Sequence, residues 1–370
     1  MDSKADVLKL TSRLRKAGYD PELIATALTQ VKLRRKARTK FGEFAEQLLF
    51  TEAGLEQASR LSVAAIHAGR FRNAGIKNVA DLGCGIGAES LALASLDLTV
   101  TAFELDELTA AIATFNLANF PNVSVLQADV TQLDLSIYEG LIFDPARRDN
   151  RNRIFKPEDF SPSFDFVLVK AKSKPTIVKL GPGHPHNQIP EEAEAVWVSV
   201  NGDLVELALY FGDIKRASIK RAALLITGSA RYEITSATAD VVHAPIGSIG
   251  KYLYEPDNSL IRSHLLGQLA EELSLQAISP EIAYLTSDQL VSSPWLTAFE
   301  IIDELPFDRK KLKSYLKEKD VGILEIKKRG ADVIPEELRK ELNLKGKNSA
   351  TLVITRVLDQ HRVLVVEPHR

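Results

Sequence analysis

The stretch Asp81-Leu82-Gly83-Cys84-Gly85-Ile86-Gly87 (DLGCGIG) decides the fold of this chain. It ends a short apolar run, and the helical pattern ESLALASL follows it at residues 89–96. Glycines allow a backbone to pass close to a ligand, and the N-terminus of the next helix lies behind such a loop. A strand, a glycine loop and a helix in this order predict the first unit of a parallel α/β sheet with right-handed crossovers.

Two cofactor classes use this loop geometry. The run from Gly83 through Gly85 to Ala88, with Glu104 further on, formally satisfies the fingerprint of dinucleotide-binding proteins. The loop alone therefore does not separate a dinucleotide from other nucleoside cofactors.

An acidic residue lies at the C-terminal end of each of four successive predicted strands. These residues are Asp81, Glu104, Asp129 and Asp144. Because the carboxyl ends of parallel strands form one ligand-binding edge, these side chains are expected to share a site. Asp81 suits a cationic amino group better than a pyrophosphate, Glu104 can accept from ribose hydroxyls, and Asp129 can accept from an adenine amino group. Any one acid could instead be a turn residue or a helix N-cap. Four in register with a glycine loop favour a cationic, ribose-bearing adenosine ligand over a dinucleotide.

This ordered series, over roughly residues 51–212, resembles the class I S-adenosylmethionine-dependent methyltransferases. The resemblance implies an α/β, Rossmann-like fold whose parallel sheet ends in an antiparallel hairpin, and Asn201-Gly202 between two apolar runs is the hairpin signal. The segment TEAGLEQAS (51–59), with Glu56 and Gln57, resembles the part that closes over the methionine end of the cofactor; a plain helix N-terminus is the alternative. The implied S-adenosylmethionine-binding residues are Asp81, Gly83, Gly85, Gly87, Glu104, Leu105, Asp129 and Val130.

The residues after the fourth strand, Asp144-Pro145-Ala146-Arg147, stand where this family meets the methyl acceptor. DPPY and NPPY versions hold an exocyclic amine, and DPPR versions occur among nucleic-acid methyltransferases. Here the second proline and the aromatic residue are absent, so exocyclic-amine methylation is plausible but not implied. The resemblance suggests catalytic roles for Asp144, Pro145 and Arg147. Arg147 and Arg148 could bind a phosphate, or pair with acidic neighbours.

Other candidates for the substrate side follow the same sheet edge. Lys179 lies in the strand TIVKLGPG (176–183), and the following GPGHPHNQIP loop carries His184 and His186, which could form a lid or a plain exposed loop. The His-x-His pair has no further ligand nearby, so no metal is predicted. Cys84 is the only cysteine and lies in the cofactor loop, which argues against cysteine-dependent pyrimidine C5 methylation and favours a nitrogen or oxygen acceptor.

The last eighty residues resemble the THUMP-like domain that follows methyltransferase cores in a bacterial family. That resemblance implies RNA as the partner by analogy of fold, with Lys327, Lys328 and Arg329 on a turn that could contact phosphate. Residues 1–40 hold eleven Lys/Arg against four Asp/Glu, and residues 307–350 hold thirteen against eight, although the whole chain has a net charge of −2. Both basic ends suit a polyanion, and solvated helix faces are the alternative.

The 370 residues divide into four expected segments. These are a helical N-terminal segment (1–72), the methyltransferase domain (73–250), a helical connector (251–292) and a small α+β THUMP-like domain (293–370). No signal peptide or membrane span is expected, so the chain is predicted to be cytoplasmic. The expected function is methyl transfer to a nitrogen or oxygen of structured RNA, either tRNA or rRNA. The alternatives are methylation of a protein or small molecule, and a non-catalytic RNA-binding protein that retains the cofactor fold.

Overall fold

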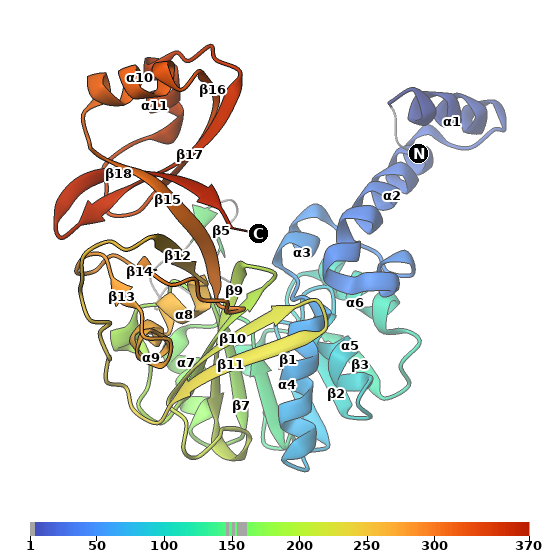
Figure 1. Cartoon of the computed structure of the whole chain (residues 1–370). Helices are drawn as coiled ribbons and strands as arrows, with labels where there is room; N and C mark the ends of the chain where they lie inside the picture. Colours follow the sequence, from blue (N-terminus) through green and yellow to red (C-terminus); the bar gives the residue numbers. More distant parts are fainter. Residues whose placement is uncertain (1–3, 146–147, 150–151, 154–160, 370) are drawn as a thin grey trace. The chain divides into compact units, whose positions relative to one another are not determined.

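A computed structural model describes residues 4–145 and 161–369, together with the backbone of 148–149 and 152–153. The N-terminal part is helical, as the sequence predicts (Figure 1). Asp20 caps the second helix by accepting from Glu22 N and Leu23 N, and Pro21 opens its first turn. These elements are α1 (Lys4–Lys16), α2 (Pro21–Phe41), η1 (Gly42–Glu46), α3 (Glu52–Gln57) and α4 (Leu61–Asn73).

A nine-stranded sheet follows, in the order β11-β10-β8-β9-β7-β4-β1-β2-β3. The pairs β3–β2, β2–β1, β1–β4 and β4–β7 are all parallel. Asn201 and Gly202, both with positive φ, form the two-residue turn between β8 and β9, and such a turn joins antiparallel strands. The predicted α/β, Rossmann-like sheet is confirmed and includes the β8–β9 hairpin. This hairpin does not end the sheet, however, because β10 pairs in parallel with β8, and β11 pairs antiparallel with β10. The strands are β1 (Asn78–Leu82), β2 (Thr99–Glu104), β3 (Val123–Gln127), β4 (Gly140–Phe143), β7 (Thr176–Leu180), β8 (Glu194–Val200), β9 (Asp203–Phe211), β10 (Arg221–Thr227) and β11 (Ala230–Ser236).

Helices connect the parallel strands. The helix α5 follows β1, α6 follows β2 and α7 precedes β7, which is the alternation that right-handed crossovers require. Residues 164–171 form the helix α7. The remaining elements of this part are α5 (Ala88–Ala94), α6 (Glu107–Leu117), η2 (Val130–Gln132), the short pair β5 (Arg148–Asp149) and β6 (Asn152–Arg153), α7 (Phe164–Ala171), η4 (His186–Gln188) and η5 (Gly212–Ile214).

A second sheet of seven strands has the order β13-β14-β12-β15-β18-β17-β16. One buried apolar cluster joins the strands to the helices at 309–318 and 335–342, through Leu312, Leu316, Leu338 and Leu342. Residues 251–292 supply two short helices and also the strands β12 to β14, which the sequence pattern did not indicate. The elements are β12 (Tyr252–Pro256), α8 (Asn258–Arg262), α9 (Leu266–Glu272), β13 (Gln276–Ala277), β14 (Leu285–Ser287), β15 (Leu296–Pro306), α10 (Arg309–Glu318), β16 (Val321–Lys328), α11 (Pro335–Leu342), β17 (Asn348–Val357) and β18 (Gln360–Pro368).

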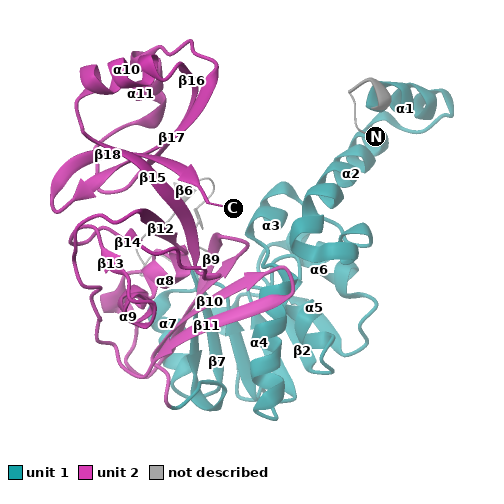
Figure 2. Cartoon of the chain, viewed as in Figure 1, with its two compact units in different colours: residues 1–180, 208–217 teal, residues 181–207, 218–370 magenta. Residues whose placement is uncertain are grey.

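The chain forms two compact units (Figure 2). Unit 1 comprises residues 1–180 and 208–217, and unit 2 comprises residues 181–207 and 218–370. Among the described residues, none of the helices is both long and apolar enough to span a bilayer.

Candidate functional site

The glycine loop between β1 and α5 has the conformation that its glycines allow. Gly83, Gly85 and Gly87 all have positive φ, a region that other residues rarely adopt. A Cβ on Gly83 would lie 3.1 Å from the carbonyl oxygen of Asp144, and one on Gly87 would lie 2.9 Å from Leu117 Cδ1. The loop is therefore packed closely against the end of β4 on one side and against α6 on the other.

The predicted ribose and adenine carboxylates lie at the ends of the next two strands. Glu104 ends β2 and accepts from the backbone N–H groups of Gly85, Leu105 and Asp106, at 2.9 to 3.0 Å. It thereby ties the glycine loop to the β2 end. Asp129 follows β3, is exposed, and accepts from the N–H and hydroxyl of Thr131, which hold its pKa below the usual range. Leu105 is exposed and Val130 is buried beside these acids.

Asp81 is buried inside unit 1, at 1% exposure, and its Oδ2 accepts from Ser90 Oγ at 2.6 Å. Burial, together with the nearby Glu89, raises the pKa of Asp81 to about 7 from an ordinary 3.8, against the opposing effect of the Ser90 hydrogen bond. This carboxyl is therefore poised to gain or lose a proton near neutral pH, and a nearby cation would favour its ionised form.

Behind the strand ends lies a buried ionic network that the sequence motifs did not reveal. Lys179 Nζ lies 2.7 Å from Asp144 Oδ2 and 3.2 Å from Glu89 Oε1. Glu89 Oε2 is 3.1 Å from Nδ1 of His67. Although burial alone would raise the pKa of Glu89, Lys179, His67 and Ser59 together hold it well below the usual range. Lys179 thus links the helix after the glycine loop to the acid at the end of β4.

Helix α3 packs directly on the glycine loop. Leu55 and Ile86 belong to one buried apolar cluster, and a Cβ on Gly54 would lie 2.6 Å from Ile86 Cγ2. Lys40 Nζ donates to the carbonyls of Leu55, Glu56 and Ala58 at 2.7 to 2.9 Å. The lysine therefore satisfies the carbonyls that end α3. Glu56 and Gln57, predicted near the methionine end of the cofactor, are exposed on this helix.

The residues predicted to meet the acceptor are only partly described. Asp144 is one-third exposed, and Pro145 after it is buried. Arg147 lies outside the described residues, and of Arg148 only the backbone, in β5, is described. Burial raises the pKa of the Cys84 thiol well above its ordinary value, and the nearby Asp81 and Glu104 carboxylates raise it further. The protonated thiol supports the argument against a cysteine nucleophile.

The other substrate-side candidates lie in unit 2. His184 is buried, whereas His186 stacks between Trp197 and His264. Lys328 at the end of β16 is exposed. Its neighbours make contacts within the unit: Lys327 pairs with Glu255 at 2.8 Å, and Arg329 donates to the carbonyl of Ala283 at 2.9 Å.

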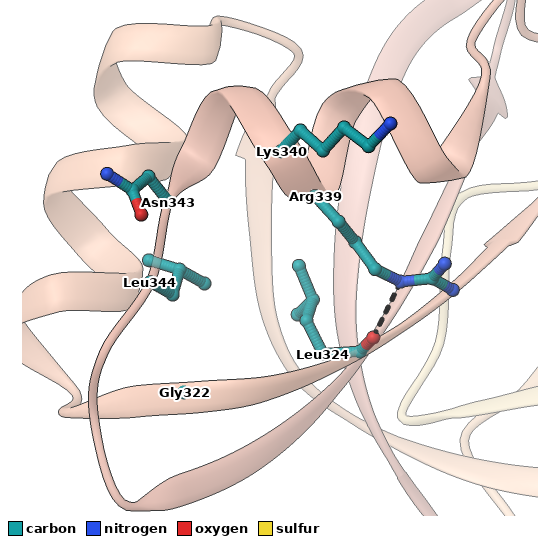
Figure 3. A pocket seen from close by; sticks show the side chains of 6 residues that line it. All are labelled: Gly322, Leu324, Arg339, Lys340, Asn343 and Leu344. Atoms are coloured by element: carbon teal, nitrogen blue, oxygen red, sulfur yellow. Dashed lines mark hydrogen bonds between the residues drawn. The ribbon is translucent and has the colours of Figure 1, made fainter.

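Strand β16, helix α11 and the residues that follow this helix also line an open pocket of about 340 Å³. Figure 3 shows its lining, in which Arg339 Nε donates to the carbonyl of Leu324 at 2.9 Å. Arg339 also pairs with Glu336 at 3.3 Å, so part of its charge is already compensated. The lining residues are Gly322, Leu324, Arg339, Lys340, Asn343 and Leu344.

Sequence reasoning missed Glu89 and His67. Both are buried, with 4% and 0% exposure. The sequence did show a histidine and a charged residue within helices whose other residues are mainly apolar. A polar group buried on an apolar helix face needs a buried partner, so each of these residues could have been recognised as one of a pair. Which partner each would find depends on the fold.

Comparison with known proteins agrees with this geometry. A family described as "THUMP domain-like" matches residues 296–368, and a domain of unknown function (DUF8688) matches residues 1–37. A crystal structure from Porphyromonas gingivalis W83, assigned to the methyltransferases, has a TM-score of 0.72 and 21% identity, and covers 99% of this chain and 98% of that one. Uncharacterized S-adenosylmethionine-dependent methyltransferases from two strains of Mycobacterium tuberculosis, CDC 1551 and H37Rv, are 30% identical over 349 residues, which is 91% of this chain and 93% of theirs. At this identity and coverage, this chain belongs to the S-adenosylmethionine-dependent methyltransferases and carries a THUMP-like domain at its C-terminus.

Proposed function

We propose that this chain is a cytoplasmic RNA methyltransferase that transfers the methyl group to a nitrogen of a nucleotide, with Asp144 as the residue that holds the acceptor. The observation that carries the proposal is the position of the Asp144 carboxylate and its contact with Lys179. Its carboxylate stands at the end of β4, one-third exposed, with one oxygen held by Lys179 at 2.7 Å. Within the described residues, no hydrogen bond to Oδ1 is present, so this oxygen can accept from a donor that arrives from outside.

The acceptor side follows from this arrangement. An exocyclic amine would donate one N–H to Asp144 Oδ1 and a second to the backbone carbonyl of Pro145. These two hydrogen bonds orient the nitrogen lone pair. Because the sulfonium of S-adenosylmethionine is a good leaving group, in-line alignment supplies most of the acceleration. The amine proton passes to Asp144 or to solvent, which the exposed part of the side chain reaches.

The residues of unit 1 fit S-adenosylmethionine, which supplies the electrophilic methyl group when bound. Gly85 has positive φ, and a Cβ at this position would meet no atom of the described residues within 4 Å, which is consistent with room for a ligand above the loop. Glu104 already accepts three backbone N–H groups, which leaves about one of the roughly four lone-pair sites of a carboxylate for a ribose hydroxyl. Asp129 is exposed and can accept from the adenine amino group.

RNA is favoured as the substrate by the THUMP-like C-terminal domain and by the basic helix α10 of that domain. Its first residues are Arg309, Lys310 and Lys311, all exposed. Lysine and arginine on such a surface give affinity for the phosphate backbone and little choice of sequence.

A protein or small molecule remains the second candidate, because several predicted RNA contacts are used inside the protein. In the N-terminal basic segment, Arg34 donates to the carbonyl of Leu48 and Arg38 pairs with Glu46. Lys40 donates to carbonyls at the C-terminal end of α3. Cations committed to such contacts have less charge to offer a polyanion.

The test is incubation of the purified protein with tritiated S-adenosylmethionine and total RNA from a strain lacking the gene, beside wild-type RNA. Label that enters only the deletion-strain RNA is the expected result, and nuclease digestion then identifies the nucleotide. Label in neither RNA, while calorimetry still detects cofactor binding, would redirect the search to proteins and metabolites.

The variant Asp144→Asn tests the proposed role of this side chain. We expect methyl transfer to fall by about 10²- to 10⁴-fold, the usual contribution of a positioned acid or base, while cofactor affinity stays unchanged. Asp165→Asn, at an exposed acid in the first turn of α7, is the matched control and should keep full activity. Equal activity of both variants would remove Asp144 from the reaction.

A further inference from the structure

Three aromatic rings stack in unit 2. The ring of His186 lies 5.0 Å from that of Trp197 and 3.9 Å from that of His264, nearly parallel to both. Trp197 is completely buried, whereas the two histidines are partly exposed. The stack therefore leads from the core of unit 2 to its surface.

Two arginines join this stack. Arg221 opens β10 opposite Ala195 of β8, so it shares a sheet face with Trp197, two residues further along. Arg262, at the end of α8, donates from Nε to the carbonyl of Pro182 at 3.1 Å and from Nη2 to that of His184 at 3.4 Å. These bonds fix the loop that carries His186.

Positive charge exceeds negative charge in this cluster. Burial, and after it the nearby His264, Arg262 and Arg221, together lower the pKa of His186 to about 4, whereas a hydrogen bond to the Arg262 backbone opposes them. Burial, Arg221, Arg262 and His243 likewise lower the pKa of His264. The carboxylate that acts on Arg221 is Asp240. Among the described residues, the charged side chains that act on these groups are thus two guanidiniums and one carboxylate, while the imidazoles of His186 and His264 are held in their neutral form.

Two polar atoms of the cluster are buried without a partner. Within the described part of the chain, neither Arg221 Nη1 nor His186 Nε2 has a hydrogen-bond partner. A buried donor or acceptor left in this state destabilises the fold, and a ligand that pairs with both atoms would remove that cost. The ligand has to be anionic, since it must offset the positive charge.

We propose that Arg221, Arg262, His186 and His264 form a phosphate-binding site in unit 2, which holds a backbone phosphate of the RNA substrate. A phosphate accepts from guanidinium nitrogens in a fork geometry, and its oxygens can pair with Arg221 Nη1 and with protonated His186 Nε2 at once. Proton uptake by His186 would therefore accompany binding. The choice of RNA as the source of the phosphate rests on the proposed function; the site itself does not.

The first arm of the test uses inorganic phosphate with the full-length protein. We expect the wild-type protein to broaden the ³¹P resonance of phosphate and to take up protons on binding. Arg221→Gln should abolish both effects. Arg231→Gln, at an exposed arginine on β11, is the matched control and should keep both. No interaction of phosphate with the wild-type protein, or the same loss in both variants, would reject the site.

The second arm measures binding of an RNA oligonucleotide by fluorescence anisotropy over a series of salt concentrations. Loss of one phosphate contact in Arg221→Gln should weaken binding about tenfold and lower the slope of log affinity against log salt by about 0.7. His264→Asn gives a second test, since asparagine tolerates the positive φ of 60° at this position. Phosphate binding that depends on Arg221, with RNA binding unchanged in both variants, would reject RNA as the ligand. RNA binding absent from the wild-type protein itself would instead count against the proposed function.

Discussion

The buried lysine of unit 1 offers the sharpest test of the site. Lys179 is 7% exposed at its side chain and contacts two carboxylates, at 2.7 and 3.2 Å. Lys179→Met keeps most of the volume and removes the charge, which leaves Glu89 in a dry environment with His67 and Ser59 as its remaining partners. Removing one member of a buried ion pair usually costs about 3–5 kcal/mol, a large part of the roughly 5–15 kcal/mol that stabilises a typical domain.

The assay is a double-mutant cycle. For a part of this size, about 2–4 °C of melting temperature is lost per kcal/mol, so Lys179→Met should melt roughly 6–20 °C below the wild-type protein. Adding Glu89→Gln removes the uncompensated charge and should recover a substantial part of that loss. Lys172→Met, an exposed lysine just after α7, is the control and should stay within about 0.5 kcal/mol of wild type.

Two results would refute this reasoning. A loss below about 1 kcal/mol for Lys179→Met would mean that the lysine is not the main partner of Glu89. Additive effects of the two substitutions would mean that they do not interact, since residues in contact normally couple by about 0.5–3 kcal/mol.

Two further predictions concern cofactor binding, both measured by calorimetry. Because burial holds the pKa of Asp81 near 7 and a cationic amino group would favour its ionised form, S-adenosylmethionine should bind more tightly as the pH rises from 5.5 to 7, by up to about tenfold per pH unit. Asp81→Asn should bind with little pH dependence, and an unchanged pH profile in this variant would contradict the assignment. Gly54→Ala would bring a methyl group 2.6 Å from Ile86 Cγ2 and should displace α3 from the glycine loop, so cofactor affinity should fall about tenfold for an overpacking cost of about 1–3 kcal/mol. Gly69→Ala, a helix position where nothing lies within 4 Å, is its control.

Local pattern was sufficient to predict the first half of the sheet. The glycine loop, the acids at the strand ends and the Asn201-Gly202 turn each carry their conformation in a few adjacent residues, so their place follows from sequence. The short strands β12 to β14 could not be predicted from the sequence, because two to five residues give too little periodicity to distinguish a strand from a loop.

The ionic network could not be predicted for a different reason. His67, Glu89 and Lys179 come from α4, α5 and β7, and no spacing rule relates residues so far apart in the chain. The basic run at residues 32–40 shows the opposite case, in which a clear local pattern suggests a role that the tertiary contacts do not bear out. It resembles an arm for a polyanion, yet Lys40 serves to end α3, and only the tertiary contacts reveal that use.

The network also explains why a glutamate is buried in the first turn of α5. If Lys179 contacted only Asp144, the two side chains could move together. Neither oxygen of the Asp144 carboxylate would then have a fixed position. Glu89 holds Lys179 from the other side, at 3.2 Å, and His67 in turn holds Glu89 at 3.1 Å. Helix α5 follows directly from the glycine loop and carries Glu89. Through Glu89 and Lys179, this helix therefore determines the position of Asp144 Oδ2, and with it the position of Oδ1. The distance between the proposed cofactor and acceptor positions is therefore fixed inside unit 1, by residues that need contact neither ligand.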